Sequence, residues 1–377
     1  MPAPDAHGYL EVNLVASHAT GQARLLLIGL GDLGRRLALA LATRPEVGEL
    51  VLAGRRAADG ASFAELAATC GSASVRFQSL DCLDVDAVAA LLRREQPDLV
   101  VQCAALLSPW AIGALSTPGA RVLASAGFAV QLPAHLPAVL AVMRAARAAE
   151  FRKPIVNCSF PDVIHPILAR LDLAPTIGIG NVGMIAAVVR TVLRQAGRPH
   201  HRVRVLAHHC HVTAVMTRDP SHLAVGVHPR VFIDEAGTAA DELVYCGQPL
   251  ASSRELNALS AVHGLDIILA LLPGGRPLAT SAPGPSGLPG GWPVKIADGR
   301  VELDLPPSLP RDVALAACEA AAAGDGVARI ADDGTVYFTD AAQRAVESLA
   351  PELAAPLAPA DGLARFALLR DQLMGPP

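Results

Sequence analysis

The sequence predicts an α/β protein, with a Rossmann-type doubly wound parallel sheet followed by a second, mixed α+β domain. Three observations lead to this fold class. Apolar strands alternate with helical patterns through the first half, a glycine fingerprint joins the first strand to the first helix, and the alternation ends near residue 160. A chain of 377 residues is also long enough to bury two cores.

The glycine fingerprint lies between a short apolar run, Leu25–Ile28, and a helix-forming segment at 35–42. The run is typical of a strand buried on both faces of a parallel sheet. In this context the first glycine permits a tight turn, the second lets the backbone approach a pyrophosphate, and the third lets the helix pack on the strand. The helix N-terminus then faces the phosphates. We therefore predict dinucleotide binding at Gly29, Gly31, Asp32, Leu33 and Gly34.

The remaining strands and helices of the first half continue the same alternation. We expect six strands separated by helices, with the cofactor at the carboxyl ends of the strands. The predicted strands after the first include 49–54, 75–80, 98–104 and 154–158, and the helices between them are 61–68, 85–94 and 133–150. Ala104 and Ala105 follow one of these strands directly, so we predict that they also contact the cofactor.

The end of the second strand predicts which dinucleotide binds. An NAD-binding fold usually has a carboxylate here for the ribose hydroxyls, but this chain has Arg55 and Arg56 after Gly54. Guanidinium groups suit a 2′-phosphate, so NADP(H) is the predicted cofactor. Alternatively, only one of these arginines binds and the other is solvated. Asp32 would repel a pyrophosphate, or it caps the following helix instead.

The second half predicts a mixture of helices, strands and one long loop. Residues 273–293 are rich in Gly, Pro and Ser, which indicates a loop that can act as a lid. Asp298-Gly299 and Asp333-Gly334 are favoured turn pairs of two hairpins, at 294–305 and 328–338. The other predicted elements are helices at 161–171, 184–195 and 255–272, strands at 203–215 and 231–233, and helical structure from about 340.

These patterns divide the chain into four parts. Residues 1–21 form an N-terminal arm or an extra strand, and 22–160 form the NADP-binding domain. Residues 161–338 form a domain for substrate binding or oligomerisation, and 339–377 form a C-terminal helical segment.

Four stretches of the first half resemble the saccharopine dehydrogenase-like reductases, a group that also includes opine-forming enzymes and relatives of dihydrodipicolinate reductase. They are Leu27–Gly34, Leu52–Arg56, Val101–Ala105 and Val156–Asp162. The resemblance covers mainly residues 22–165, and its motifs are specific for the cofactor half. It implies hydride transfer between NADPH and a C=N bond, often an imine of an amino acid and a keto acid.

The predicted function is therefore an NADPH-dependent oxidoreductase that reduces the imine of a small amino-acid-derived substrate. One alternative is an NADP-dependent reductase of a carbonyl compound. An alternative of another class is a non-catalytic NADP(H)-binding sensor or partner protein.

Three side chains are candidates for the proton transfer that accompanies the hydride. His165 shares the first turn of a helix with Asp162, and a histidine titrates near neutral pH. Alternatively, Asp162 caps that helix and His165 is only packed. His135 opens a helix after a long connection. Lys295 follows the glycine-rich loop and can pair with a substrate carboxylate or donate a proton, as lysine does in some related reductases, or it is a solvated hairpin residue.

Other side chains are predicted to contact the substrate. These are Trp110, Asp162, Asn181 and His209. Asn181 lies in the predicted glycine-rich turn 176–183, whose residues 178–183 are a possible anion nest or an ordinary turn.

The run His208-His-Cys-His211 falls in the predicted strand 203–215, which places His209 and His211 on one face. Two ligands are fewer than a metal site usually has, and a third, such as His222 or His228, would have to come from elsewhere. We therefore predict no metal. The remaining interpretations are a strand that brings one histidine to the substrate and a sheet without a catalytic role.

Composition excludes several classes of protein. No unbroken apolar run reaches the roughly 18 residues of a membrane helix, and no signal peptide is visible. A net charge of −4 with 3% aromatic residues argues against a nucleic-acid partner. Seven scattered cysteines without CxxC spacing indicate reduced thiols and a cytoplasmic location. The alanine-rich C-terminal helix suggests a homodimer.

Overall fold

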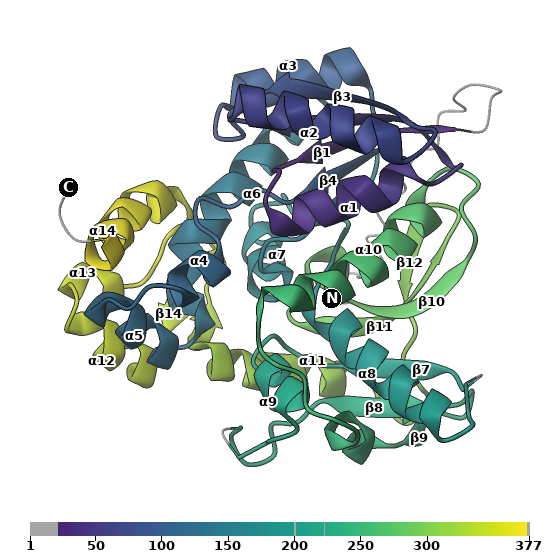
Figure 1. Ribbon diagram of the computed structural model, residues 1–377. Coiled ribbons are helices and arrows are strands. Elements are labelled where there is room, and N and C mark those ends of the chain that lie inside the picture. Colours follow the sequence, from purple (N-terminus) through teal and green to yellow (C-terminus); the bar gives the residue numbers. More distant parts are fainter. Residues whose placement is uncertain (1–21, 200, 222, 375–377) are drawn as a thin grey trace, which may run out of the picture.

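The computed structural model describes residues 22–199, 201–221 and 223–374 (Figure 1). The predicted N-terminal arm or strand and His222 lie outside these described residues.

A six-stranded parallel sheet forms the upper half of the molecule in Figure 1, in the order β3-β2-β1-β4-β5-β6. This order confirms the predicted doubly wound fold. The last strand is only two residues long and lies inside the stretch 176–183 that we predicted to be a glycine-rich turn. The strands are β1 Ala23–Ile28, β2 Val47–Gly54, β3 Ser74–Ser79, β4 Leu99–Gln102, β5 Ile155–Asn157 and β6 Ile177–Gly178.

Helices cover both faces of the sheet, and the pleat of β1 divides its side chains between two cores. Leu25 and Leu27 enter the core shared with α1 and α10, whereas Leu26 and Ile28 enter the core shared with α3 and α6. This double burial explains why the run is apolar throughout. The helices of this half are α1 Asp32–Ala42, α2 Ala57–Cys70, α3 Val85–Glu95, α4 Pro109–Gly113, α5 Pro118–Ser125 and α6 Leu132–Ala148.

By length and composition, one described segment could cross a membrane. It is Phe128–Ala148, which includes α6, and 89% of its most apolar window is buried inside the fold. Burial of this kind is the usual environment of a helix in a protein core.

The described residues of 161–271 contain a small antiparallel sheet and four α-helices, and one of these helices returns to the first half. Helix α10 packs on α1, so the chain from both halves covers one face of the parallel sheet (Figure 1). The elements are α7 Pro161–Ala169, α8 Asn181–Gln195, β7 Val203–Leu206, α9 His211–Thr217, β8 Arg230–Ile233, β9 Thr238–Ala239 and α10 Asn257–Leu271.

Strands occupy nine of the 21 residues of the stretch 273–293, so its prediction as one long loop was wrong for 278–283 and 291–293. Strands β10 Leu278–Pro283, β11 Gly291–Ala297 and β12 Arg300–Leu303 form an antiparallel sheet. Its small residues permit close packing, and Trp292 is fully buried. The predicted turn at Asp298-Gly299 is confirmed, because Ala297 pairs with Arg300 and both turn residues have positive φ.

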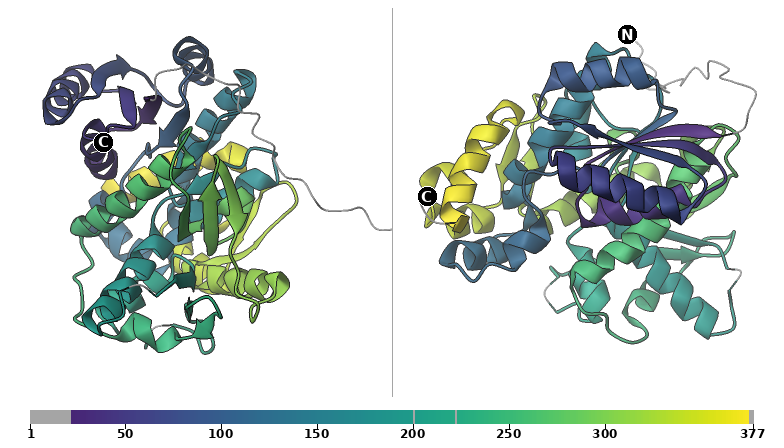
Figure 2. Two further views of the ribbon diagram at one scale, coloured as in Figure 1. Left: turned by 90° about the vertical axis from the view of Figure 1, so that its right-hand side faces the viewer. Right: turned by 45° about the horizontal axis from the view of Figure 1, so that its top comes forward.

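The C-terminal segment packs beside the first half, as both views of Figure 2 show. Leu369 and Leu373 of α14 are buried in the same core as Leu136 of α6. The elements are α11 Arg311–Ala322, β13 Val327–Ile330, β14 Val336–Phe338, α12 Asp340–Glu347, α13 Pro351–Ala354 and α14 Gly362–Met374.

Candidate active site

A large cleft of about 1390 Å³ lies at the carboxyl ends of the strands. One end, the fingerprint end, is formed by the loops after β1, β2 and β3. The other, the His209 end, is formed by the segments after β4 and β5 together with the first residues of α8 and α9. This is the place where open α/β sheets bind ligands.

At the fingerprint end, the glycines have the geometry that the motif requires. Gly29 has φ +103°, and a Cβ there would lie 2.4 Å from the nitrogen of Ala104. A Cβ on Gly34 would lie 2.0 Å from the oxygen of Gly29, whereas a Cβ on Gly31 would meet nothing within 4 Å. The first and third glycines therefore permit close packing, and the second leaves open space beside the helix N-terminus.

Asp32 does not cap α1, so that alternative was wrong. Gly31 occupies the N-cap position, and no side chain bonds to the helix there. Instead, Asp32 accepts hydrogen bonds from Arg36 (2.9 Å) and Asn257 (2.9 Å). Burial acts to raise the pKa of Asp32, but these hydrogen bonds and the charges of Arg36 and Arg254 outweigh it and lower that pKa. The nearby cations offset the carboxylate charge beside the predicted pyrophosphate position.

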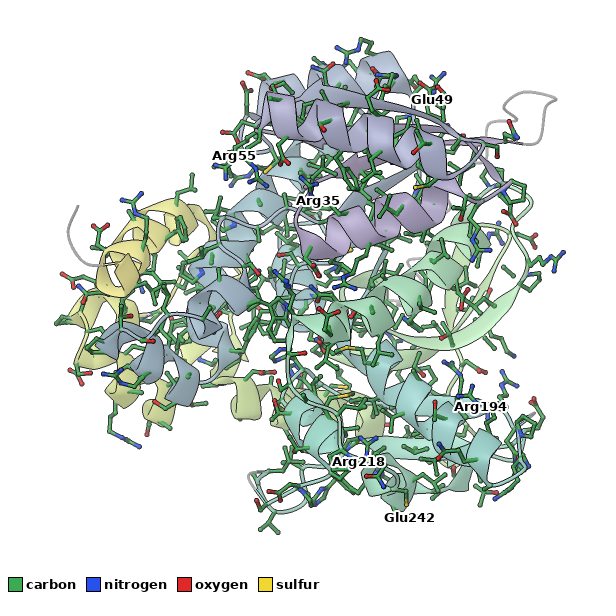
Figure 3. All side chains as sticks on the ribbon, viewed as in Figure 1. Arg35, Glu49, Arg55, Arg194, Arg218 and Glu242 are labelled. Carbon is green, nitrogen blue, oxygen red and sulfur yellow. The ribbon has the colours of Figure 1, made fainter. Side chains whose placement is uncertain are left out.

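The two arginines after β2 both line the cleft, but their surroundings differ. Arg56 lies 3.1 Å from Asp59, which also accepts a hydrogen bond of 2.7 Å from Arg35. Arg55 makes no ion pair or hydrogen bond within the described part of the chain. Figure 3 shows Arg55 and Arg35 on the same side of the upper half. Arg55 is therefore the more available of the two for a phosphate.

Strands β4 and β5 end in a matched pair of side-chain amides. Gln102 and Asn157 are register partners, and both are fully buried. Gln102 bonds to the backbone nitrogen and oxygen of Ala104 at 2.7 and 2.9 Å, and Asn157 bonds to the same two atoms of Ser159 at 2.9 and 3.0 Å. These bonds fix the backbone of two cleft-lining segments, which include the predicted cofactor contacts Ala104 and Ala105.

His165 lies behind the cleft wall and does not line the cleft. Its ring is fully buried, with Nδ1 2.8 Å from the oxygen of Gly284 and Nε2 3.2 Å from Nδ2 of Asn157. Burial lowers the pKa of His165 to about 4, although the bond to Gly284 acts in the opposite direction. The neutral ring supports Asn157 and makes no contact with the cleft.

Asp162 is also fully buried, and it does not cap α7, whose N-cap is Phe160. Its Oδ2 accepts a hydrogen bond of 2.7 Å from Nδ2 of Asn181, the first residue of α8. Burial raises the pKa of Asp162. Asn181 itself lines the cleft, as does Trp110, whose indole nitrogen lies 3.4 Å from Oδ1 of Asn257.

Lys295 lies on β11 and does not line the cleft. Its side chain is 54% exposed, and its Nζ lies 3.6 Å from Asp304. This environment matches the alternative of a solvated hairpin lysine. Of the three side chains predicted to transfer a proton, only His135 lines the cleft.

His209 lines the cleft and pairs with a buried carboxylate. Its Nδ1 lies 2.6 Å from Oδ1 of Asp325, which is 2% exposed. Its Nε2 has no hydrogen-bond partner among the described residues, and the side chain is 25% exposed. Burial acts to lower the pKa of His209, but the charge and hydrogen bond of Asp325 and the charge of Asp162 outweigh it and raise that pKa.

Asp325 also organises the backbone around His209, and for this reason the predicted strand 203–215 was wrong beyond Leu206. Asp325 Oδ2 lies 2.7 Å from Nδ1 of His208 and accepts a hydrogen bond of 3.0 Å from the nitrogen of Cys210. The chain turns around this carboxylate and begins α9 at His211. Burial acts to raise the pKa of Asp325, but the adjacent histidines hold it well below its usual range.

Two phenylalanine rings pack against the imidazole of His209. The ring centroid of Phe128 lies 4.2 Å from that of His209, and the Phe160 centroid lies 5.2 Å away in an edge-on arrangement. Phe160 has φ +41°, a strained conformation for a bulky residue. His135 lies beside Phe128, with Nδ1 3.0 Å from the hydroxyl of Ser159. Burial, the larger cause, and the charge of His209 lower the pKa of His135 to about 4.

Comparison with known proteins establishes the fold. Neither a family model nor a curated protein matches the sequence. A lactate dehydrogenase from a Medee basin deep-sea metagenome library is similar in structure, with TM-score 0.50 and 14% identity over 81% of this chain and 97% of that one. Malate dehydrogenase from Archaeoglobus fulgidus, in complex with NADH, gives TM-score 0.51 and 15% identity over 80% of this chain and 98% of that one. The chain therefore has the fold of NAD(P)-dependent Rossmann dehydrogenases.

Sequence reasoning missed two features of the His209 end. Asp325 lies 116 positions from His209, and no local spacing marks it as a partner. Phe128 lies in the long connection before α6, which has no recognisable motif. Only the packing of distant segments brings these residues together.

Proposed function

We propose that the protein is an NADP(H)-dependent oxidoreductase that reduces the C=O bond of a small substrate, or oxidises the corresponding alcohol. The pair formed by His209 and Asp325 carries this proposal. His209 lines the same cleft as the glycine fingerprint with its side chain 25% exposed, and Asp325 is buried behind it.

The residues of the fingerprint end fit a dinucleotide. The open side of Gly31 and the uncapped N-terminus of α1 suit a pyrophosphate, and Arg55 suits a 2′-phosphate. When bound, NADPH supplies the hydride, and the protein's part is to orient and protonate the substrate.

His209 acts as the general acid in reduction. A hydride added to a neutral carbonyl carbon leaves negative charge on the oxygen, which requires a proton. Asp325 holds the imidazole through Nδ1 and favours its protonated form, so that Nε2 donates toward the cleft. In the reverse direction, neutral His209 accepts the proton of the alcohol.

The same pair favours a carbonyl over an imine. An iminium ion already carries its proton, so hydride addition yields a neutral amine without a further donor. A carbonyl needs a donor at the moment its oxygen becomes negative. The resemblance to saccharopine dehydrogenase-like reductases supports the imine function through the cofactor half alone, whereas the acid lies at the other end of the cleft.

NADPH consumption by the purified protein tests the proposal. One panel contains ketones and aldehydes, and a second contains amines mixed with keto acids. We expect oxidation of NADPH with members of the first panel. Turnover only with the second panel would favour imine reduction, and tight NADPH binding without turnover in either would favour a non-catalytic sensor.

A further inference from the structure

Charge is unevenly distributed along the cleft. Apart from histidines, the cleft is lined by two kinds of charged side chain. Some lie in the loops after β1, β2 and β3, and the others belong to α1 or form ion pairs with residues of α1. They are Asp32, Arg55, Arg56, Asp59, Asp81, Arg254 and Glu255. Arg254 and Glu255 come from the second half, but they lie 3.8 Å from Asp32 and 3.1 Å from Arg36, respectively. These charges therefore belong to the fingerprint end.

The His209 end is lined by apolar and neutral polar side chains instead. Phe128 and Phe160 contact the imidazole, and further apolar side chains complete the wall, namely Trp110, Ile179, Met184 and Val212. No lysine or arginine lines this end in the part of the chain that the structure describes. The positions outside that part, 1–21, 200, 222 and 375–377, contain neither residue type in the sequence.

The His209 end offers few groups that could compensate the negative charge of a substrate carboxylate or phosphate. Burying an anion without a cation or several donors is costly, because the lost hydration is not replaced. The positive charge of His209 is already balanced by Asp325 at 2.6 Å. The start of α8 is a possible anion site, but the carboxyl group of Asp162 lies 2.7 Å from its first side chain, Asn181, and opposes a second anion.

Two neutral polar atoms in the same wall suit an uncharged group. Oε1 of Gln131 and Nε2 of His135 are buried and have no hydrogen-bond partner among the described residues. Both side chains line the cleft beside Phe128. A buried polar atom of this kind is costly unless a ligand or water satisfies it, and a hydroxyl or amide group would do so.

We propose that the substrate is an uncharged, mostly apolar ketone or aldehyde, or the corresponding alcohol, that carries no carboxylate or phosphate beside the reacting carbon. This inference rests on the proposed function and specifies its substrate class. It also separates this chain from the lactate and malate dehydrogenases of the same fold, whose named substrates are carboxylates.

Matched substrates test the inference. An aryl keto acid, its methyl ester and its primary amide share one reacting carbonyl, and only the acid carries a charge. We expect kcat/KM with NADPH to be at least about tenfold higher for the two neutral compounds than for the acid, the smallest penalty expected for an uncompensated anion. An acid that reacts as well as its ester would overturn the inference and leave the proposed function intact. If none of a wider set of such pairs reacts, both proposals fail.

A new cation at the His209 end provides a second test. Val212 lies on α9 and lines the cleft, so Val212→Arg adds a guanidinium there, and Val212→Met adds a similar length without charge. We expect the arginine variant to raise the ratio of kcat/KM for the acid to that for the ester, and the methionine variant to leave it unchanged. The melting temperature of the NADP⁺-loaded protein, measured with the hydroxy acid and with its neutral ester, gives the same comparison without turnover. A wild-type protein stabilised more by the hydroxy acid contradicts the inference.

Discussion

The two ends of the cleft differ in the groups that form their surfaces. At the fingerprint end, backbone and glycines form the surface, and paired charges surround it. At the His209 end, packed side chains from distant segments enclose one ionisable pair in apolar surroundings. The first kind of site suits binding of a charged cofactor, and the second suits proton transfer, because a low local dielectric strengthens the coupling of an acid to its partner. Substitutions at the two ends should therefore change different quantities.

The largest effect is expected at His209. His209→Gln removes the titratable group, and we expect kcat for carbonyl reduction to fall by about 10²–10⁴-fold, as for loss of a general acid. The dissociation constant of NADPH, measured by fluorescence titration, should change little. A variant with nearly normal turnover would show that His209 is not the general acid, and the two ends would then not divide proton transfer from cofactor binding.

Replacement of Arg55 and Arg56 should instead change the affinity for NADPH. We expect the double alanine variant to weaken NADPH binding by roughly 10–100-fold, because charge-assisted hydrogen bonds contribute about 1.5–3 kcal/mol. NADH binding should change far less, since it has no 2′-phosphate. The single variants should show that Arg55 contributes more than Arg56, which already pairs with Asp59. An equal loss for both cofactors would reject NADP(H) preference.

His165 tests whether a buried histidine behind the wall acts through stability. His165→Leu keeps much of the volume but removes a buried hydrogen bond to the oxygen of Gly284, which still accepts one from the nitrogen of Gly287, at a cost of about 0.5–1.5 kcal/mol in the free energy of unfolding. Urea denaturation measures this loss. We expect the pH dependence of kcat to stay as in the wild type, and a shifted profile would show that His165 titrates during turnover.

Lys295 should give the smallest effect. Its exposed Nζ lies 3.6 Å from the buried Asp304, which keeps its pairs with Arg202 and Arg204 when Lys295 is removed, so the loss should be about 0–1 kcal/mol. Lys295→Ala should retain kcat, KM and the affinity for NADPH within the error of steady-state assays. A large fall in turnover would indicate that Lys295 takes part in proton transfer.

The fingerprint end could be predicted from the sequence, because the residues that form it are close together in the chain. The spacing Gly29-x-Gly31-x-x-Gly34 and the position of Arg55 lie within two consecutive strand–helix units. The doubly wound parallel sheet and most helices of the first half followed from the same alternation, whereas the short strand β6 did not.

The His209 end could not be predicted because tertiary contacts override local pattern there. Alternation favoured a strand through 203–215. The buried Asp325 instead pairs with both His208 and His209, and the chain changes direction at this point. Composition favoured a loop at 273–293, but small buried residues form a sheet around Trp292. His209 itself was a substrate-contact prediction, and its partner was absent from the prediction because Asp325 comes from the 3-10 helix Ala323–Asp325 that follows α11.

The pH dependence of Asp325→Asn most directly tests the central claim that His209 and Asp325 form the acid. The carboxylate raises the pKa of His209, so reduction by the wild type should be lost only as pH rises through that raised value. In Asp325→Asn the midpoint of kcat/KM should move to lower pH by about 1–3 units, the effect of removing an adjacent opposite charge. Asp81→Asn, at the fingerprint end, serves as the control and should keep the wild-type midpoint. An unchanged midpoint in an Asp325→Asn protein that remains folded and active would contradict the account.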